Sequence, residues 1–273
     1  MIDTTNSILG IIAGKGEYPI LLAEAAKKQG VKKICAVAFK KETSRNIEKF
    51  ADTVEWLPIG GLASLINALK KHNVSRAVMA GQITPTHLFR VRMDMEMIKL
   101  LASLPARNAH SIFGAVADKL AENGISLASA STFMEEHMAP EGVLTCREPG
   151  EDQWRDIRLG LTVATATSNL EIGQTVIVKG GTIVAVEAFE GTNETIKRAA
   201  RLAGKGTVIV KTAKKGHDMR FDIPVVGSTT IRILKKYSAS ALALQAGKAI
   251  MLNRDDLISA ADKAGIAIVS VKK

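Results

Sequence analysis

The residues that could do chemistry in this sequence gather in two stretches of its second half. In the first, Glu190, Gly191 and Thr192 lie where a predicted strand gives way to a predicted helix. Thr192 is expected to cap that helix, so that the N–H groups of the first turn face an anion. The sequence therefore predicts a phosphate site here, with a carboxylate beside it.

The second stretch combines acidic residues with four cations that flank a glycine loop rather than a helix, namely Lys211, Lys214, Lys215 and Arg220. We assign these cations to an anionic ligand. We expect the segment that follows to be extended, so that Arg220 and Asp222 share one face while Phe221 and Ile223 share the other. An acid beside clustered cations fits metal binding or water activation at a phosphate. The alternative is an ordinary Arg–Asp surface pair, which contributes little.

Two glycine turns of the first half could also approach a ligand. Gly14, Lys15 and Gly16 follow a predicted buried strand, where a dinucleotide-binding fold holds its phosphate loop. Gly81 and Thr84 occupy the equivalent strand end of a later β–α unit. They would place a backbone N–H and a hydroxyl beside the first loop, and the alternative is a simple tight turn.

The glycine pattern of the first turn disfavours NAD. Pro19 stands where the dinucleotide fingerprint has its third glycine, and the predicted second strand ends in Lys40 and Lys41 instead of a ribose-binding carboxylate. The Lys-Ser/Thr ending of a nucleotide-hydrolysing P-loop is also absent from the sequence. A nucleotide bound in another pose stays open.

Metal-ligating and nucleophilic patterns leave one kind of chemistry. The histidines are isolated in the sequence, at His72, His87, His110, His137 and His217. This spacing disfavours a soft-metal site, and the sequence contains no G-x-S-x-G motif for a serine nucleophile. Oxygen ligation by carboxylates remains, which suits Mg²⁺, with Mn²⁺ as an alternative, and a phosphate-bearing substrate.

The elements that must position these residues alternate in type along the first half. Apolar runs predict strands, and longer periodic stretches predict helices. The predicted strands are 8–12, 34–39, 77–80 and 125–128, and the predicted helices are 19–29, 62–71, 93–103 and 111–123. We interpret Met93, Met95 and Met97 as core residues of the third helix. This alternation predicts a parallel α/β sheet with ligands beyond its carboxyl edge.

The second half predicts a separate, mixed α/β domain. Residues 137–153 are rich in Pro, Gly and charge, and we interpret them as a connection between a domain at 1–136 and a domain at 154–273. Two β-branched runs, 175–179 and 182–186, surround Gly180-Gly181 and predict a hairpin. The other predicted elements are helices at 154–170, 195–203 and 229–236, a strand at 208–211 and a β–α–β tail at 241–271.

Composition agrees with a two-domain globular protein that has an anionic partner. The chain has 273 residues, and 37 Lys and Arg against 27 Asp and Glu give a net charge of +10. The two cysteines, Cys35 and Cys146, suit a reducing compartment. We find no apolar stretch of membrane-spanning length and no signal-peptide pattern, so we expect a cytoplasmic protein.

Three motifs resemble those of the LpxI family, the UDP-2,3-diacylglucosamine pyrophosphatases of lipid A biosynthesis. They are Ile-Ala-Gly-x-Gly-x-x-Pro near the N-terminus, Ala-Val-Glu-Ala-x-Glu-Gly-Thr at 185–192 and Asp-Met-Arg-Phe-Asp-x-Pro-x-x-Gly at 218–227. The resemblance runs in order across nearly the whole chain. In one place, before the helix at 111, the chain has Arg107-Asn108-Ala109-His110 where we expect Gly followed by acidic residues.

The resemblance implies a Rossmann-like N-terminal domain, a distinct C-terminal domain and an active site between them. It also implies Mg²⁺-dependent cleavage of a UDP-lipid to UMP and 2,3-diacylglucosamine 1-phosphate (lipid X), with Asp222 as the essential aspartate. Asp222 would hold the metal or activate the water. Such a substrate needs cations for its phosphates and an apolar groove for its acyl chains. The resemblance also implies that the protein transiently contacts the inner face of the inner membrane.

Two other functions compete with this interpretation. A nucleotide-sugar oxidoreductase could use the same N-terminal fold, but the incomplete glycine fingerprint disfavours it. A nucleic-acid-binding protein would explain the positive charge. However, the basic residues are not interleaved with aromatic residues, and no helix-turn-helix or zinc-finger pattern is visible, so we expect no nucleic-acid partner. The sequence assigns no oligomeric state.

Overall fold

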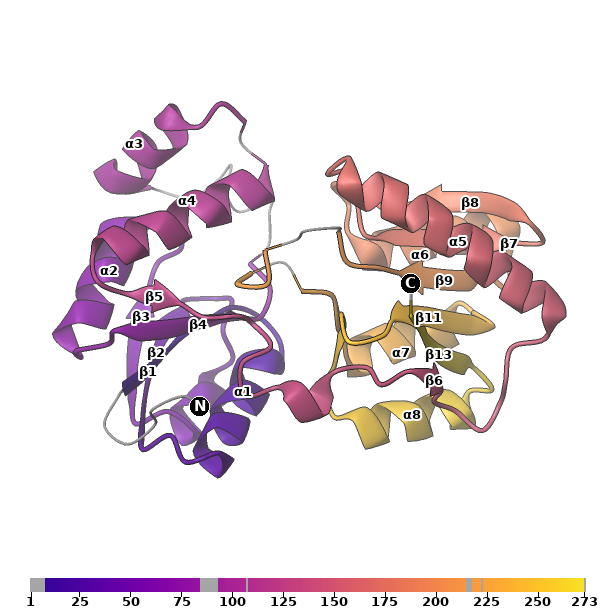
Figure 1. The fold of residues 1–273 in the computed structure, drawn as a ribbon, viewed down its shortest axis with the longest axis horizontal. Helices are drawn as coiled ribbons and strands as arrows, with labels where there is room; N and C mark the ends of the chain where they lie inside the picture. The colour runs from indigo at the N-terminus through magenta and orange to yellow at the C-terminus, as the bar shows by residue number, and fades with distance from the viewer. Residues whose placement is uncertain (1–7, 84–92, 107, 215–217, 222, 273) are drawn as a thin grey trace. The chain divides into compact units, whose positions relative to one another are not determined.

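The computed structural model describes residues 8–83, 93–106, 108–214, 218–221 and 223–272 (Figure 1). The chain forms two compact units. The first unit is Met1–Glu135 together with Asp218–Asp222, and the second unit is Glu136–His217 together with Ile223–Lys273. The chain therefore returns to the first unit for one short segment. Both units are α/β, which confirms the predicted fold class.

The first unit is built on a parallel sheet with the strand order β3-β2-β1-β4-β5. Its strands are β1 (Ile8–Ala13), β2 (Lys33–Phe39), β3 (Thr53–Leu57), β4 (Arg76–Ala80) and β5 (Ser126–Leu127). The order reverses between β1 and β4, which is where ligands bind in Rossmann-like sheets. The sequence did not predict β3, because this edge strand is only partly buried and has no continuous apolar run.

Helices pack on both faces of this sheet. They are α1 (Tyr18–Lys28), α2 (Leu62–Lys71) and α4 (Ala109–Glu122), and α3 (Met95–Ser103) contacts α2 and α4. Short 3-10 helices lie at Arg45–Lys49 and, where the second unit begins, at Glu135–His137. Side chains of α2 and α4, among them Leu62, Leu69 and Leu120, form a core against β1 and β2. The predicted core role of the methionines is wrong for Met95, which is 65% exposed, and none of the residues of α3 is buried.

The second unit contains a mixed sheet with the strand order β6-β13-β11-β9-β7-β8. Its strands are β6 (Gly142–Val143), β7 (Thr175–Lys179), β8 (Thr182–Val186), β9 (Val208–Lys211), β11 (Ala241–Gln245) and β13 (Ala267–Val271). A separate parallel pair is formed by β10 (Val225–Val226) and β12 (Ile250–Met251). The predicted hairpin is present as β7 and β8, with positive φ at both Gly180 and Gly181.

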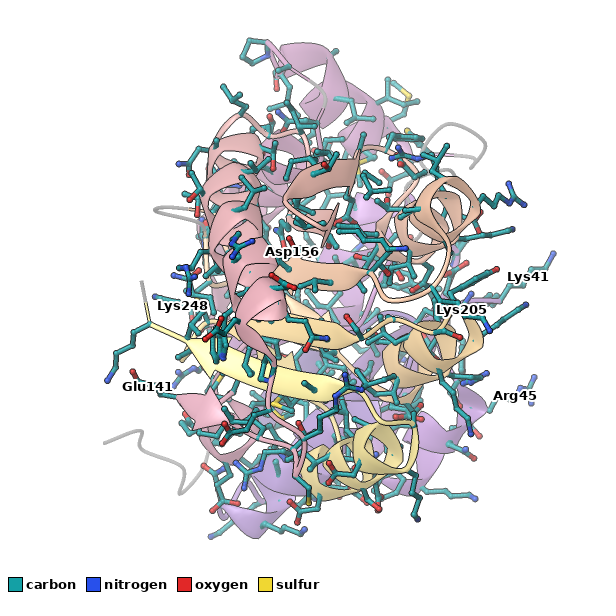
Figure 2. All side chains as sticks on the ribbon, turned by 90° about the vertical axis from the view of Figure 1, so that its right-hand side faces the viewer. Lys41, Arg45, Glu141, Asp156, Lys205 and Lys248 are labelled. Carbon is teal, nitrogen blue, oxygen red and sulfur yellow. The ribbon has the colours of Figure 1, made fainter. Side chains whose placement is uncertain are left out.

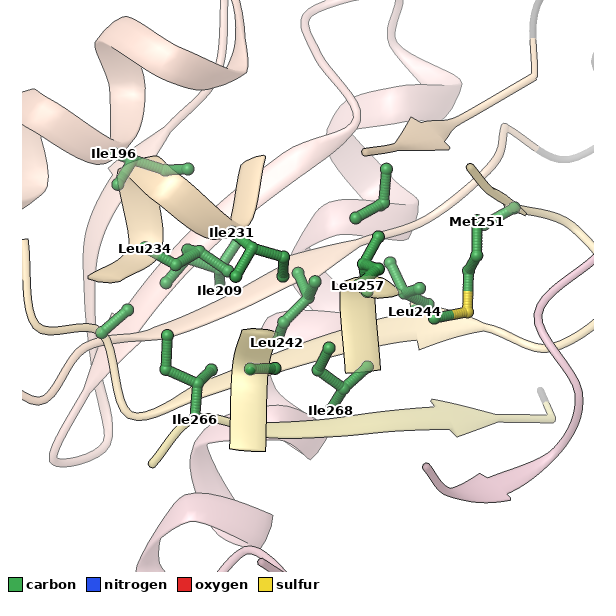
Figure 3. Close-up of a cluster of buried hydrophobic side chains, with 14 of the residues drawn as sticks. Ile196, Ile209, Ile231, Leu234, Leu242, Leu244, Met251, Leu257, Ile266 and Ile268 are labelled. Atoms are coloured by element: carbon green, nitrogen blue, oxygen red, sulfur yellow. The ribbon is translucent and has the colours of Figure 1, made fainter. Parts of the chain in front are cut away.

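One helix covers one face of this sheet and three cover the other. The helices are α5 (Glu151–Asn169), α6 (Thr192–Ala203), α7 (Ser228–Lys236) and α8 (Arg254–Lys263). Figure 3 shows the core on the three-helix face, where Ile196, Leu234 and Leu257 meet strand residues such as Leu242. On the opposite face, α5 packs through Ile157 against alternate residues of the same strands.

A buried carboxylate ties α5 to the hairpin. Asp156 is 4% exposed, and its two oxygens accept hydrogen bonds from the N–H groups of Gly180 at 2.9 Å and Gly181 at 2.6 Å. In Figure 2, Asp156 lies against the sheet, whereas Lys205 and Lys248 extend away from the ribbon. The tight turn of two glycines is therefore held by a side chain from another element.

Residues 137–153, interpreted from sequence as a connection, contribute structure to the second unit. Val143 and Gly142 of β6 pair with Val269 and Ser270 of β13. Helix α5 begins at Glu151, three residues earlier than predicted, because Gly150 and Gln153 form a capping arrangement there. Among the described residues, we find no helix with the length and hydropathy needed to cross a bilayer.

Candidate functional site

The two glycine turns of the first unit cross at the point where the strand order reverses. The N–H of Gly14 donates to Ala80 O at 2.7 Å, and Lys15 and Gln82 exchange two backbone hydrogen bonds. A Cβ added to Gly14 would lie 2.7 Å from Gln82 O, and one added to Gly81 would lie 2.7 Å from Lys15 O. Glycine is needed at both positions because the two backbones touch.

This crossing changes what the turns can offer a ligand. The N–H groups of Gly14 and Lys15 are occupied by the second turn, so they do not face an anion. Lys15 and Gly16 are exposed at the carboxyl edge of the sheet, and the Lys15 side chain remains the predicted phosphate contact. Thr84 lies outside the described residues.

The segment Asp218–Phe221, which the sequence predicted as extended, forms a turn instead. The N–H of Phe221 donates to Asp218 O at 3.2 Å, and the N–H of Arg220 donates to Asp218 Oδ1 at 3.0 Å. An aspartate side chain that binds the backbone two residues ahead stabilises such a turn, and this local bond outweighs the alternation of apolar residues. The turn is anchored in the first unit by the hydrogen bond from Ala130 N to Met219 O. Asp222 itself lies outside the described residues.

Arg220 forms an ion pair with Asp218. Arg220 Nε and Nη2 donate to both carboxylate oxygens of Asp218, with distances of 2.6–3.0 Å. The Arg220 guanidinium holds the pKa of Asp218 below its usual value, and Asp218 in turn raises the pKa of Arg220. Both groups are therefore charged at neutral pH, and Nη1 of Arg220 lies 4.0 Å from Asp118 Oδ1.

Aromatic contacts fix this turn on α4. The ring of Phe221 lies 5.8 Å from that of Phe113 and 5.7 Å from that of His110, measured between centroids. Asn108, in the stretch that departs from the family pattern, caps α4 by accepting a hydrogen bond from Ser111 N at 2.8 Å. That residue thus has a structural role, and the helix it starts carries the surface on which Phe221 packs.

In the second unit, Thr192 is the centre of a polar network. Its hydroxyl accepts a hydrogen bond from Lys211 Nζ at 2.9 Å and donates to Glu187 Oε1 at 2.9 Å. Thr175 is fully buried, and its Oγ1 lies 3.2 Å from Thr192 Oγ1. Strand β9 supplies the lysine, the connection from β8 to α6 supplies Glu187, and α6 itself begins with Thr192. The structure therefore brings the predicted Lys211 and Thr192 together.

The N-terminus of α6 is set up differently from the prediction. Thr192 was expected to be the capping residue, but it is the first helical residue, and the cap position is held by Gly191 with φ +80°. The hydroxyl of Thr192 turns instead to Lys211 and Glu187. Since no side chain of the described residues caps α6, its first-turn N–H groups remain available beside the Lys211 ammonium. A helix N-terminus next to a cation favours an anion.

The other two predicted contacts of this unit have partners within the protein. Glu190 accepts a hydrogen bond from Arg198 at 2.6 Å. Burial alone would raise the pKa of Glu190, but the bond and charge of Arg198 bring it below its usual value. Lys214 is paired with Glu171. In the sequence, Glu190 lies close to Thr192 and Lys214 lies close to Lys211, but neither ion pair was predicted from it.

The described residues contain no group of three His, Cys, Asp or Glu side chains that could hold a metal ion by themselves. Mg²⁺ usually takes only one or two carboxylates and completes its shell with water and substrate phosphates. Within the described part of the chain, Glu187 Oε2 is buried and lacks a hydrogen-bond partner. The donor chemistry of this oxygen fits a hard cation.

The first unit also contains an apolar cavity of about 60 Å³ at the carboxyl ends of its strands. Every residue that lines it is apolar or glycine, including Ile12 of β1, Phe39 of β2 and Met79 of β4. Helices α3 and α4 close it through Met97 and Phe113.

Comparison with known protein families agrees with the motifs. Residues 8–137 match the LpxI N-terminal domain, and residues 140–269 match the LpxI C-terminal domain. The chain belongs to the LpxI family. It is 28% identical to the UDP-2,3-diacylglucosamine pyrophosphatase LpxI of Caulobacter vibrioides, over 96% of this chain and 97% of that one.

Solved structures resemble this LpxI-family chain only distantly. CobK precorrin-6A reductase matches with a TM-score of 0.30 and 11% identity, over 98% of this chain and 88% of that one. The biotin carboxylase subunit of pyruvate carboxylase matches with a TM-score of 0.27 and 15% identity, over 71% of this chain and 41% of that one.

The family motifs contain the residues that sequence reasoning left out. Glu187 lies in the motif at 185–192 and Asp218 opens the motif at 218–227, yet neither was proposed as a site residue. Asp218 determines where Arg220 points. The signal for each was its place within an LpxI motif, next to a residue that was chosen.

Proposed function

We propose that this protein hydrolyses the diphosphate of UDP-2,3-diacylglucosamine, with Mg²⁺, to UMP and 2,3-diacylglucosamine 1-phosphate. The observation that carries the proposal is the match of both LpxI domains, in order, along the chain. The relative in Caulobacter vibrioides, named for this activity, aligns over nearly the full length of both proteins.

The polar network of the second unit supports a phosphate-binding role. The ammonium of Lys211 and the N–H groups at the start of α6 offer positive charge from two directions. Thr192 holds the ammonium in place, because its hydroxyl is itself fixed by Glu187. These groups orient a phosphate and stabilise the negative charge that develops on its oxygens in the transition state.

Asp222 supplies the carboxylate of the reaction in this proposal. The other proposed contributors to substrate binding are Gly14, Lys15, Gly16, Gly81, Thr84, Glu190, Gly191, Lys214 and Arg220. The hydrolysis adds water across the diphosphate: a P–O bond forms to the water oxygen, and the bond from the same phosphorus to the bridging oxygen breaks. When bound, Mg²⁺ neutralises phosphate charge and lowers the pKa of a coordinated water. Asp222 is the oxygen donor that we propose for it.

The substrate also indicates where the protein works. Its acyl chains lie in a membrane, whereas its diphosphate is in water, so we propose transient contact of a cytoplasmic enzyme with the inner face of the inner membrane. The positive net charge of +10 supports this, because anionic lipids attract basic proteins.

Product identification tests the proposal. The purified protein is incubated with UDP-2,3-diacylglucosamine and Mg²⁺, and the products are identified by mass spectrometry. We expect UMP and the lipid 1-phosphate in equal amounts, loss of turnover with EDTA, and recovery with Mg²⁺ or Mn²⁺. An intact substrate would overturn the function, and full turnover in metal-free buffer would overturn the metal requirement.

A further inference from the structure

We propose that Tyr18 and His110 are positioning residues for the hydrolysis, because they hold the segment Asp218–Phe221 in place on the first unit. This inference rests on the proposed function and deepens it, since Asp222 directly follows Phe221 in the chain. Consecutive Cα atoms lie about 3.8 Å apart, so whatever fixes Phe221 also limits where the carboxylate of Asp222 can be. Catalysis is sensitive to such placement, because the reacting groups must be aligned.

Tyr18 holds the segment through the backbone of one intervening residue. The Tyr18 hydroxyl donates a hydrogen bond to Ala130 O, and the N–H of Ala130 donates to Met219 O at 2.6 Å. Tyr18 and Ala130 are both almost fully buried. Burial raises the pKa of the Tyr18 phenol above its usual value, so the hydroxyl keeps its proton and remains a donor. Without it, Ala130 O would be buried and would lose this partner.

Helix α1 supports the same stretch of backbone from its other end. Tyr18 is the first residue of α1, and Gln29, which follows its last residue, donates from Nε2 to Phe133 O at 3.0 Å. The backbone from 130 to 133 is therefore attached at both ends of a helix that contacts β1 and β4 of the parallel sheet. This stretch gives Met219 O a fixed hydrogen-bond donor.

His110 holds the other end of the segment through contact between rings. His110 and Phe113 are three positions apart on α4, so they lie on the same face of the helix. The ring of Phe221 is tilted by 57° against that of His110 and by 37° against that of Phe113. Tilted rings at these separations attract each other. Phe221 also packs against the apolar core of the first unit.

The histidine contributes its ring rather than a hydrogen bond from Nδ1. This nitrogen of His110 is buried, and it has no hydrogen-bond partner within the part of the chain that the structure describes. A buried nitrogen without a partner adds no stability, whereas the ring contact does. Phenylalanine should therefore be able to replace His110. The three LpxI motifs specify neither residue, since Tyr18 occupies a variable position of the first motif and His110 lies in the stretch that departs from the family pattern.

Variants of the full chain test the proposal by their kinetics. Tyr18→Phe removes only the hydroxyl, His110→Ala removes the ring, and His110→Phe keeps a ring. We expect kcat to fall roughly tenfold in the first two, less than the hundredfold that a misplacement of about 1 Å can cause. KM should stay unchanged, because neither side chain is proposed to touch the substrate. His110→Phe should turn over like the wild type.

His72→Ala is the matched control. His72 is a second half-buried histidine of the first unit, at the end of α2, where its Nε2 lies 2.7 Å from Glu55 Oε1. Its loss should lower the melting temperature without lowering kcat. The melting temperature of every variant shows that it is folded.

The Asp222→Asn background gives a measurement that a merely structural role would not affect. If Tyr18 and His110 act through Asp222, then Tyr18→Phe and His110→Ala should not lower the residual turnover of Asp222→Asn any further. Losses that multiply would overturn the proposal. Wild-type kcat in Tyr18→Phe and His110→Ala would also overturn it, and an equal loss in His110→Phe and His110→Ala would overturn the role of the ring.

Hydrogen exchange separates this inference from the function itself. The N–H groups of Arg220 and Phe221 form hydrogen bonds within the turn, so their exchange reports whether the segment is held. They should exchange faster in Tyr18→Phe and His110→Ala than in the wild type, His110→Phe and His72→Ala. This result would support the inference even if UDP-2,3-diacylglucosamine were not hydrolysed and the proposed function failed. Unchanged exchange would overturn it, even in an active pyrophosphatase.

Discussion

At the scale of single residues, the hydroxyl of Thr192 joins opposite charges. It accepts from Lys211 and donates to Glu187, both at 2.9 Å. A lysine side chain is long and mobile. Because its ammonium is already held in place, less side-chain conformational entropy is lost when a phosphate binds. The same arrangement holds Glu187 with its second oxygen buried and without a hydrogen-bond partner among the described residues.

Replacing Lys211 should therefore weaken the handling of phosphate without unfolding the protein. Lys211→Met keeps the apolar stem and removes the charge. Because a hydrogen bond to a charged group contributes roughly 1.5–3 kcal/mol, we expect kcat/KM to fall on the order of tenfold or more. Lys205→Met, at an exposed lysine of the same unit, is the matched control. Unchanged kinetics in Lys211→Met would exclude this lysine from the site.

The Asp218–Arg220 pair predicts a pH-dependent contribution to stability. Arg220 lowers the pKa of Asp218 below its ordinary value of 3.8. A carboxyl group whose pKa is lowered by folding stabilises the protein above its unfolded pKa, and this contribution is lost as the pH falls through the folded value. Asp218→Asn should thus melt below the wild type at neutral pH, and the difference should shrink as the pH falls below 3.8.

A control separates this pair from a general effect of charge. Asp255→Asn removes a carboxylate that is 97% exposed and lies 3.9 Å from Arg254. It should leave the melting temperature within a small margin of the wild type across the same pH range. A constant difference between Asp218→Asn and wild type at every pH would contradict the ion-pair account.

At the scale of elements, the β7–β8 hairpin depends on a side chain from α5. Asp156 accepts hydrogen bonds from two glycine N–H groups and is almost fully buried. Asp156→Ala should cost about 2–4 kcal/mol, because each buried donor left without a partner costs roughly 1–3 kcal/mol and water replaces part of the loss. Chemical denaturation measures this directly. Asp152→Ala, on the exposed side of the same helix, should change little, and equal stability of both variants would refute the role of Asp156.

Elements with a strong local signal could be predicted from the sequence. Helix α2 and strand β9 have the predicted bounds, and the hairpin was predicted from Gly180-Gly181. The failures occurred where a longer-range or side-chain contact outweighed the local pattern. Strand β3 was missed because its edge position leaves it partly exposed. The Asp218–Phe221 turn was predicted as extended because its apolar residues alternate, and this alternation does not reveal the hydrogen bond from Arg220 N to the Asp218 side chain.

At the scale of the whole molecule, the residues of the candidate site come from separate parts of the chain. Lys214 pairs with Glu171, 43 positions earlier, and Lys211 with Thr192, 19 positions earlier. The sequence identified Lys211, Lys214 and Thr192 by their types, but it could not give their partners, because these depend on strand order. The short segment Asp218–Asp222 belongs to the first unit although its neighbours on both sides belong to the second. No local pattern predicts that return.

The central claim is that Asp222 carries hydrolysis in a folded LpxI-family enzyme, and Asp222→Asn tests it most directly. The amide is nearly isosteric but neutral, and it is a poor metal ligand. We predict a variant that melts like the wild type and still binds UDP-2,3-diacylglucosamine, with turnover lowered roughly a hundredfold or more, as expected for a positioned acid–base group. A weaker affinity for Mg²⁺ in the same variant would assign the carboxylate to the metal. Near-normal turnover of the folded variant would contradict the account.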